Sequence, residues 1–138
     1  AHLQNHPGQI AFAGGRKDET DCDLFHTALR EAEEEIGLNP ESVQKLGQLP
    51  CHDTITNYSV TPFVSMVPAD LTFKPEPGEV QEVFIVPLRH VLNLDNYRIE
   101  SRYWCGQKRF YYVVPYGPYY IWGATACILY GMAEASRE

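Results

Sequence analysis

The sequence lacks a long apolar run and carries no signal-peptide pattern. No stretch of 18 apolar residues occurs in it, so we expect neither a membrane-spanning helix, a membrane partner nor secretion by the signal-peptide route. With 44% hydrophobic and 21% charged residues, the composition is typical of a globular protein. A length of 138 residues predicts one domain, residues 1–138, with a core of its own.

Cysteine is scarce as well, with four scattered residues at positions 22, 51, 105 and 127. No two of them form a C-x-x-C pair, which excludes the usual spacing of a zinc site or a thioredoxin-like redox motif. The expectation that fits this spacing is reduced thiols in a cytoplasmic protein.

Basic residues are outnumbered, because 11 Lys and Arg stand against 18 Asp and Glu, for a net charge of −7. Binding to a nucleic-acid backbone needs clustered Lys and Arg, so we expect no nucleic-acid partner. An anionic small molecule would be repelled too, unless metal ions neutralised its binding site. The sequence leaves the oligomeric state open, and a homodimer is one state that it allows.

The most informative stretch of the sequence is a predicted helix over residues 20–36. These residues are good helix formers without internal proline or glycine, and apolar residues recur along one stripe of the helix. The stripe comprises Phe25, Ala28, Leu29, Ala32 and Ile36. Several residues near the helix start can cap it: Thr20 or Asp21 can accept from the free backbone N–H groups, and capping is also the ordinary role for Asp18 and Asp23.

Three glutamates form an acidic ridge beside this stripe. Glu31, Glu34 and Glu35 are spaced i, i+3 and i+4 and therefore share one side, whereas Arg30 and Glu33 point elsewhere. Like charges at this spacing repel by about a few tenths of a kcal/mol per pair. Mg²⁺ or Mn²⁺, which prefers oxygen ligands, would offset the repulsion. The plain alternative is a solvated helix face, which a bare E-x-x-E-E usually is.

Glycines at both ends of the helix favour the metal-binding interpretation. Gly14-Gly15 precedes it, and two residues without Cβ atoms let the backbone turn sharply and approach a ligand. Gly37 ends the helix. A loop, a helix and a turn that frame an acidic ridge are much rarer than an acidic helix alone.

This stretch resembles the box of the Nudix hydrolases, whose pattern is G-x5-E-x7-R-E-U-x-E-E-x-G-U with U a bulky apolar residue. The residues that match are Gly15, Arg30, Glu31, Glu34, Glu35, Gly37 and Leu38. Three features depart from the pattern. Asp21 stands at the first glutamate, the gap from Asp21 to Arg30 is eight residues rather than seven, and Ala32 is small for a U position.

The resemblance implies an α/β fold, a mixed β-sheet sandwiched between helices. It implies a metal-dependent pyrophosphohydrolase in which Glu31, Glu34 and Glu35 hold Mg²⁺ or Mn²⁺. Arg30 would orient these ligands by pairing with one of them or with Asp21. Nudix proteins have a strand-forming segment before the glycine-rich loop, so we expect residues to be missing before Ala1 and one strand with them.

A second resemblance concerns the substrate. Residues 6–15 are similar to the signature of the coenzyme A pyrophosphatase branch, which ends in G-x3-F-P-G-G after an arginine. The matching residues are Gly8, Phe12, Gly14 and Gly15. Ala13 replaces the proline, and Gln4 replaces the arginine, which removes a bidentate contact to phosphate.

This branch implies coenzyme A as the small-molecule diphosphate substrate, with phosphopantetheine and adenosine 3′,5′-bisphosphate as products. Phe12 and the Gly14-Gly15 loop would then contact the substrate, the loop by its backbone. Residues 122–126 resemble the W-G-x-T-A run of the same branch. Two alternatives stay open: a Nudix hydrolase for NADH, a nucleotide sugar or a dinucleoside polyphosphate, and a Nudix-fold binding module without turnover.

The remaining elements follow from alternation and turn residues. The sequence predicts strands over 43–49, 58–67 and 79–86, a loop over 68–78, a short helix over 87–93, a hairpin of 97–104 with 108–116, and a closing helix over 124–136. Pro62 indicates an edge or a bulge. Glu79, at the start of its strand, is the candidate for a further ligand or general base, a part that acidic residues of this region often play in Nudix enzymes. The plain alternative is a solvent-facing glutamate.

Overall fold

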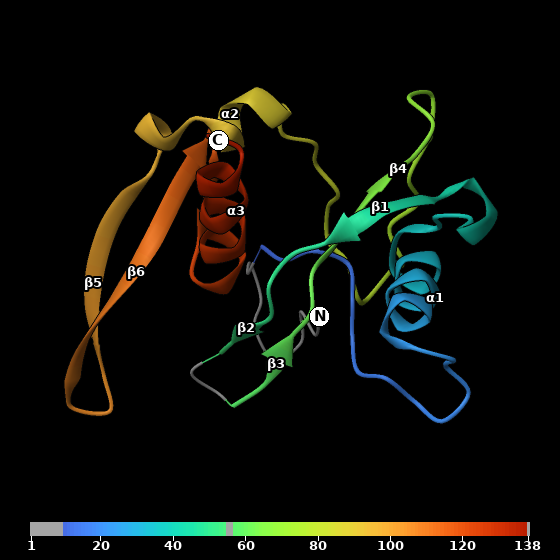
Figure 1. The fold of residues 1–138 in the computed structure, drawn as a ribbon, viewed down its shortest axis with the longest axis horizontal. Coiled ribbons are helices and arrows are strands. Elements are labelled where there is room, and N and C mark those ends of the chain that lie inside the picture. The colour runs from blue at the N-terminus through green and yellow to red at the C-terminus, as the bar shows by residue number, and fades with distance from the viewer. Residues whose placement is uncertain (1–9, 55–56, 138) are drawn as a thin grey trace. The chain divides into compact units, whose positions relative to one another are not determined.

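The computed structural model describes residues 10–54 and 57–137, which fall into two units (Figure 1). The first unit contains residues up to 53 and 59–84, and the second contains 54–58 and residues from 85 onward. The predicted turn at His6–Gln9, the match at Gly8 and the departure at Gln4 lie outside the described residues. None of the helices within the described ranges is long and apolar enough to cross a membrane.

The helix of the first unit is α1, Leu24–Ile36. It begins four residues later than predicted, because the carboxylate of Asp23 accepts from the backbone N–H of His26 at 2.8 Å and caps it. The capping role predicted for Thr20 or Asp21 is wrong. Thr20 instead donates its N–H and its hydroxyl to Asp18, in a turn that precedes the helix. The predicted end is confirmed, since Gly37 adopts the left-handed conformation with φ of 71°.

Two short antiparallel sheets follow α1 and a 3₁₀ turn, Pro40–Ser42. β1 (Gln44–Gln48) pairs with β4 (Phe63–Met66), and β2 (His52–Asp53) pairs with β3 (Ser59–Val60). The strand predicted over 58–67 is therefore divided into β3 and β4 at Pro62, which has no N–H for a strand ladder. The predicted loop over 68–78 contains neither helix nor strand.

The strand predicted over residues 79–86 is wrong, because the structure assigns no strand there. The backbone N–H groups of Glu79 and Val80 donate to the carbonyl of Glu76 and close a turn. Gly78 lies in this turn with φ of 87°, a conformation that suits glycine. Alternation of apolar and polar residues predicts a strand but does not supply the neighbouring strand that it must pair with.

The second unit begins with α2 (Leu88–Leu92) and a 3₁₀ turn, Leu94–Asn96. Three antiparallel strands follow in the order β5-β6-β7, namely β5 (Arg98–Trp104), β6 (Gln107–Tyr116) and β7 (Tyr119–Trp122). The β5–β6 hairpin is as predicted, whereas β7 was not predicted. Of its four residues, only Trp122 belongs to the W-G-x-T-A run, and Gly117 turns β6 back into β7 with φ of 55°.

The closing helix α3, Ala124–Ala135, packs on this sheet, as Figure 1 shows. Tyr130 of α3 stacks on Tyr112 of β6 with ring centroids 4.0 Å apart. Val113 and Val114 are fully buried and form the centre of this unit's core. Helices and small sheets together give the α/β class that was predicted, and every strand pair within the described ranges is antiparallel.

Candidate functional site

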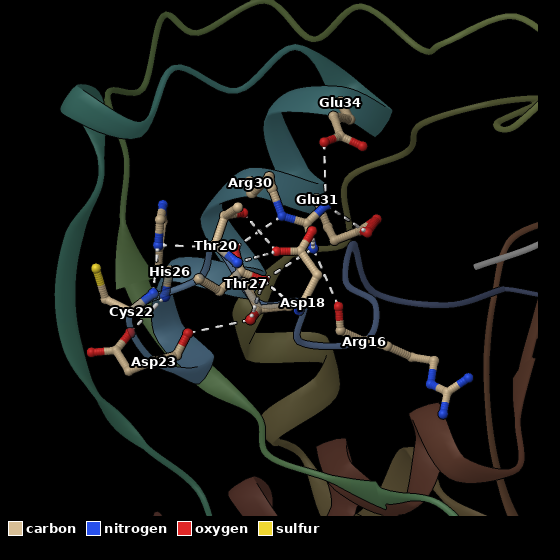
Figure 2. A network of polar contacts seen from close by, with 11 residues as sticks. Arg16, Asp18, Thr20, Cys22, Asp23, His26, Thr27, Arg30, Glu31 and Glu34 are labelled. Atoms are coloured by element: carbon tan, nitrogen blue, oxygen red, sulfur yellow. Dashed lines mark hydrogen bonds and ion pairs between the residues drawn. The ribbon is translucent and has the colours of Figure 1, made fainter.

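Arg30 lies at the centre of a polar network at the start of α1 (Figure 2). Its Nε donates to Asp21 Oδ1 at 3.0 Å and its Nη2 to Asp21 Oδ2 at 3.1 Å, so the two groups form a bidentate pair. Asp21 is buried and also accepts from the Thr27 hydroxyl and the Asp18 N–H, each at 2.9 Å. The guanidinium of Arg30, followed by the Asp18 backbone, holds the pKa of Asp21 well below its usual range. The loop is therefore tied to the helix by a charged pair.

The other edge of the Arg30 guanidinium faces the acidic ridge. Nη1 lies 3.4 Å from Glu31 Oε2 and 3.2 Å from Glu34 Oε2, while Nη2 also donates to the carbonyl of Arg16 at 3.2 Å (Figure 2). The sequence offered two partners for Arg30, Asp21 or a glutamate of the ridge, and the structure contains both. The prediction that Arg30 points away from the ridge is wrong, because its long side chain turns back across the helix surface.

Glu35 and Glu31 are held close to the glycine loop. Glu35 is only 6% exposed, and this burial, together with the nearby Glu31, raises the pKa of Glu35 to about 7. A Cβ atom on Gly15 would lie 2.5 Å from both Cδ and Oε2 of Glu31, so only glycine fits there without displacing that carboxylate. Gly14 contributes a backbone hydrogen bond to Glu35. The loop and the ridge therefore meet, as the sequence pattern predicts.

Glu34 is the most exposed of the three predicted ligands, with 56% of its side chain accessible, against 20% for Glu31. It lines an open depression with a volume of about 460 Å³. The other residues that line this depression are Glu33, Glu76, Pro77 and Glu79. Glu33, predicted to point away from the ridge, lines the depression beside the exposed Glu34.

Glu79 comes beside Glu34 without the strand that was expected to carry it. The backbone N–H of Lys74 donates to the Ile36 carbonyl and that of Glu76 to the Glu35 carbonyl, both at 2.8 Å. These bonds hold the segment against the carboxyl end of α1, and the turn after Glu76 carries Glu79 to the depression. The sequence indicated Glu33 only as pointing away from the ridge, and it did not indicate Glu76. The only available signal was the run K-P-E-P-G-E at residues 74–79, whose proline-glycine pair marks a turn.

The remaining predicted substrate contacts are simpler to place. Phe12 is half exposed, before the glycine pair. A Cβ atom on Gly14 would meet nothing within 4 Å, in contrast to Gly15. The side of Gly14 on which a Cβ atom would project is therefore open.

The predicted metal ligands are linked through two sets of contacts. Glu31 neighbours Glu35, and Arg30 contacts both Glu31 and Glu34. In residues 10–54 and 57–137 no three His, Cys, Asp or Glu side chains are grouped as a metal site. The donor chemistry nevertheless fits a hard divalent cation, because Glu31 and Glu35 bring carboxylate oxygens together against the backbone of a glycine loop. The raised pKa of Glu35 is the mark of two carboxylates held close in a buried position.

Comparison with known proteins agrees with this arrangement of loop and acidic helix. A sequence profile described as the NUDIX domain matches residues 2–105. The chain belongs to the Nudix family. Two curated relatives are 41% identical over 132 residues, which cover 96% of this chain and 69% of each relative. They are described as uncharacterized Nudix hydrolases called NudL, from Escherichia coli O1:K1 and Shigella boydii serotype 18.

Membership in the Nudix family confirms the predicted fold class and the predicted type of enzyme, a pyrophosphohydrolase. The name NudL states no substrate. All four cysteines of this Nudix chain are free thiols, in agreement with the expectation from their spacing.

Proposed function

We propose that this Nudix chain hydrolyses a diphosphate linkage in a nucleoside-containing small molecule, and that the molecule is coenzyme A. The observation that carries the hydrolytic part is the contact between the glycine loop and the acidic helix. Gly15 leaves room for the Glu31 carboxylate, and Glu31 neighbours the buried Glu35. A diphosphate that approached this loop would meet backbone N–H groups on one side and carboxylates on the other.

Glu31, Glu34 and Glu35 would hold Mg²⁺ or Mn²⁺ in this proposal. A bound divalent cation supplies neutralisation of phosphate charge and a water of lowered pKa. Such neutralisation matters here because the chain carries a net charge of −7 and its substrate is an anion. The geometry supports Glu31 and Glu35 as one pair of oxygen donors, and Glu34 would complete the set from the adjacent turn of the helix.

The protein's own groups would move the proton in the reaction. Water adds to one phosphorus atom, the bridging P–O bond breaks, and a carboxylate accepts the proton of the water. Glu34 and Glu79 are the two candidates for that carboxylate, because both line the open depression beside α1. Arg30 would keep Glu31 and Glu34 in position, since its guanidinium contacts both and is itself fixed by the buried Asp21.

Coenzyme A is favoured by the resemblance of residues 6–15 and 122–126 to the coenzyme A pyrophosphatase branch. Phe12 and Gly14 would contact this substrate, and the exposure of Phe12 together with the open space at Gly14 leaves both accessible. The replacements at Gln4 and Ala13 keep two alternatives in the test: another diphosphate, such as NADH, a nucleotide sugar or a dinucleoside polyphosphate, and binding without turnover.

A panel of diphosphates tests the proposal directly. Release of phosphate-bearing products is measured for coenzyme A, NADH, a nucleotide sugar and a dinucleoside polyphosphate, with Mg²⁺, with Mn²⁺ and with a chelator. We expect turnover only with the cations and the highest kcat/KM for coenzyme A. A preference for coenzyme A of less than about tenfold would end that assignment, and binding without products would identify a binding module.

A further inference from the structure

β5 is an edge strand of the sheet that the described residues form. Its seven residues pair with β6 on one side, and among the strands of the described residues none pairs with the other side. Ile99 is 61% exposed and Tyr103 is 74% exposed. Figure 1 shows the turn of the β5–β6 hairpin extending well beyond the amino-terminal end of α3. A long exposed edge with apolar side chains is a template for another strand.

The register of the hairpin determines which backbone groups face the free side. Trp104 and Gln107 flank a two-residue turn and are paired, so they form the first hydrogen-bonded pair of the ladder. Hydrogen-bonded pairs alternate with non-bonded pairs along an antiparallel ladder. The intervening residues Ile99, Ser101 and Tyr103 therefore direct their N–H and C=O groups toward the free edge, in positions symmetric about Ser101.

The side chains of β5 are complementary to those of a second β5 turned about the same centre. A two-fold axis at Ser101 places Glu100 opposite Arg102 of the second copy, and Arg102 opposite its Glu100. The same axis places Ile99 opposite Tyr103 of the second copy. Opposite charges and apolar pairs directly across two strands are the contacts that stabilise an antiparallel pair.

We propose that the chain forms a homodimer in which the two β5 strands pair antiparallel about Ser101. The two sheets then join into one sheet of twice the size, and the exposed edge of each β5 is closed by the other. Such an interface is isologous, because residue i of one copy contacts residue j of the other and j contacts i. The outward backbone groups of Ile99, Ser101 and Tyr103 supply its hydrogen bonds.

The charge pattern selects this register over others. Parallel in-register pairing would place Glu100 against Glu100 and Arg102 against Arg102, which repel each other. An antiparallel pair centred at Ile99 would overlap only residues 98–100, whereas a centre at Ser101 uses all seven residues of β5. Charged residues on an edge strand usually discourage pairing. Here the two central charges have opposite signs, so they repel parallel stacking but attract the two-fold partner.

Neighbouring side chains hold these two charges in place. Arg98 Nε lies 2.6 Å from Glu100 Oε2, and the hydroxyl of Tyr120 donates to Glu100 Oε1. The Arg102 guanidinium lies 5.1 Å from the centre of the Trp122 ring. An ionised carboxylate has about four acceptor sites, so Glu100 can accept from another copy while it keeps these partners.

Sedimentation equilibrium of the whole chain and its charge variants tests the proposal. The native chain is expected to sediment as a dimer. Arg102→Glu would place two carboxylates against each other at both symmetric positions and weaken dimerisation by about tenfold or more. The double variant Glu100→Arg with Arg102→Glu exchanges the charges and restores dimerisation. Arg109→Glu is the matched control, because it makes the same change on β6, opposite Arg102 but away from the free edge.

Oxidative cross-linking of Ser101→Cys gives a second measurement that does not depend on the charge variants. Two residues on the axis of an antiparallel pair have Cα atoms about 5.5 Å apart, within the range of a disulfide. A reducible dimer band above the background of the native cysteines supports the proposal. The absence of that band, a monomeric native chain, a dimer that Arg102→Glu leaves unchanged, or a folded double variant that stays dissociated would each overturn it.

Discussion

At the scale of single residues, Glu34 and Glu31 lie on one helix in different surroundings. Glu31 is enclosed by the glycine loop and Glu35, whereas Glu34 is more than half exposed and lines the open depression. Arg30 contacts both carboxylates. Substitutions at Glu34 and at the glycines beside Glu31 therefore test separately the exposed carboxylate and the contact between the glycine loop and Glu31.

Replacement of Glu34 by glutamine tests the chemical role of that carboxylate. We expect Glu34→Gln to lower kcat by about 10²-fold or more, the contribution typical of a positioned acid or base, while the thermal midpoint changes little because the side chain is exposed. Initial rates on coenzyme A with Mg²⁺ measure the effect. Glu41→Gln, an exposed glutamate outside the depression, is the control, and a Glu34→Gln variant as active as that control would refute the role.

The two adjacent glycines allow a matched comparison. Gly15→Ala would place a Cβ atom 2.5 Å from the Glu31 carboxyl group, which must then move, whereas Gly14→Ala would meet nothing within 4 Å. Because the displaced group is the end of a flexible side chain, we expect Gly15→Ala to reduce kcat/KM much more than Gly14→Ala, with similar thermal midpoints for both. Equal losses of kcat/KM in the two variants would contradict this view of the loop.

At the scale of elements, the charged pair of Asp21 and Arg30 connects the loop at residues 18–21 to α1. The sequence pattern showed Asp21 only as a departure from the family box. In the structure it is buried and accepts four hydrogen bonds, from both Nε and Nη2 of Arg30, from Thr27 and from the Asp18 backbone. Asp21 has a shorter side chain than the glutamate of the pattern, and one more residue separates it from Arg30. Its carboxylate nevertheless pairs with Arg30.

Loss of the Asp21 charge should destabilise the first unit. We expect Asp21→Asn to lower the thermal midpoint by more than Asp18→Asn, because Asp18 is 53% exposed and lies 3.6 Å from Arg30 Nη2, whereas Asp21 is buried in a bidentate pair. Thermal unfolding followed by circular dichroism measures both variants. Equal decreases in the two thermal midpoints would mean that the bidentate pair stabilises the fold no more than the contacts of Asp18.

The same pair predicts a pH dependence. Arg30 lowers the pKa of Asp21 in the folded chain, so the pair stabilises fully above the ordinary aspartate pKa of about 3.9 in the unfolded chain. As the pH falls below that value, the unfolded chain takes up the proton first and the stabilisation is lost. In urea unfolding, the difference in the free energy of unfolding between the native chain and Asp21→Asn should therefore become smaller from about pH 6 to pH 3. A difference that stays constant over this pH range would contradict the lowered pKa of Asp21 in the folded chain.

Elements defined by local signals were predicted well. The end of α1 at Gly37, the β5–β6 hairpin around Cys105 and Gly106, and the closing helix α3 each depend on residues close in sequence. The prediction failed where distant contacts decide. Residues 79–86 alternate like a strand, but the bonds from Lys74 and Glu76 to the end of α1 and the turn at Gly78 override that preference.

In the candidate site too, features that depend on local sequence were predicted and features that depend on distant contacts were not. The i, i+3, i+4 spacing predicted that Glu31, Glu34 and Glu35 lie on neighbouring parts of one helix, because helix geometry is local. The sequence did not predict that Glu33 and Glu76 share the depression with Glu34, since that depends on how residues 74–79 return to α1. The acidic neighbourhood of Glu34 is therefore larger than the family box indicates.

At the scale of the whole molecule, we propose that residues 1–138 act as one Nudix domain, as the length predicted. The profile match ends at residue 105, inside the β5–β6 hairpin, but the curated relatives align with 96% of the chain. The net charge of −7 applies to this whole domain. An acidic domain that acts on an anionic diphosphate needs cations at its site, which leads to a prediction that does not depend on turnover.

Divalent cations should stabilise the folded chain without substrate. A ligand that binds only the folded state at about a hundred times its Kd stabilises that state by about 2.7 kcal/mol. We therefore expect Mg²⁺ or Mn²⁺ to raise the thermal midpoint of the native chain by several degrees. The double variant Glu31→Gln with Glu35→Gln should lose this shift, because it removes the paired carboxylates while it keeps their size. NaCl at equal ionic strength is the control for general screening, which weakens charge repulsion anywhere on the surface. A shift that NaCl reproduces, or that the double variant retains, would place the cations elsewhere than on Glu31 and Glu35.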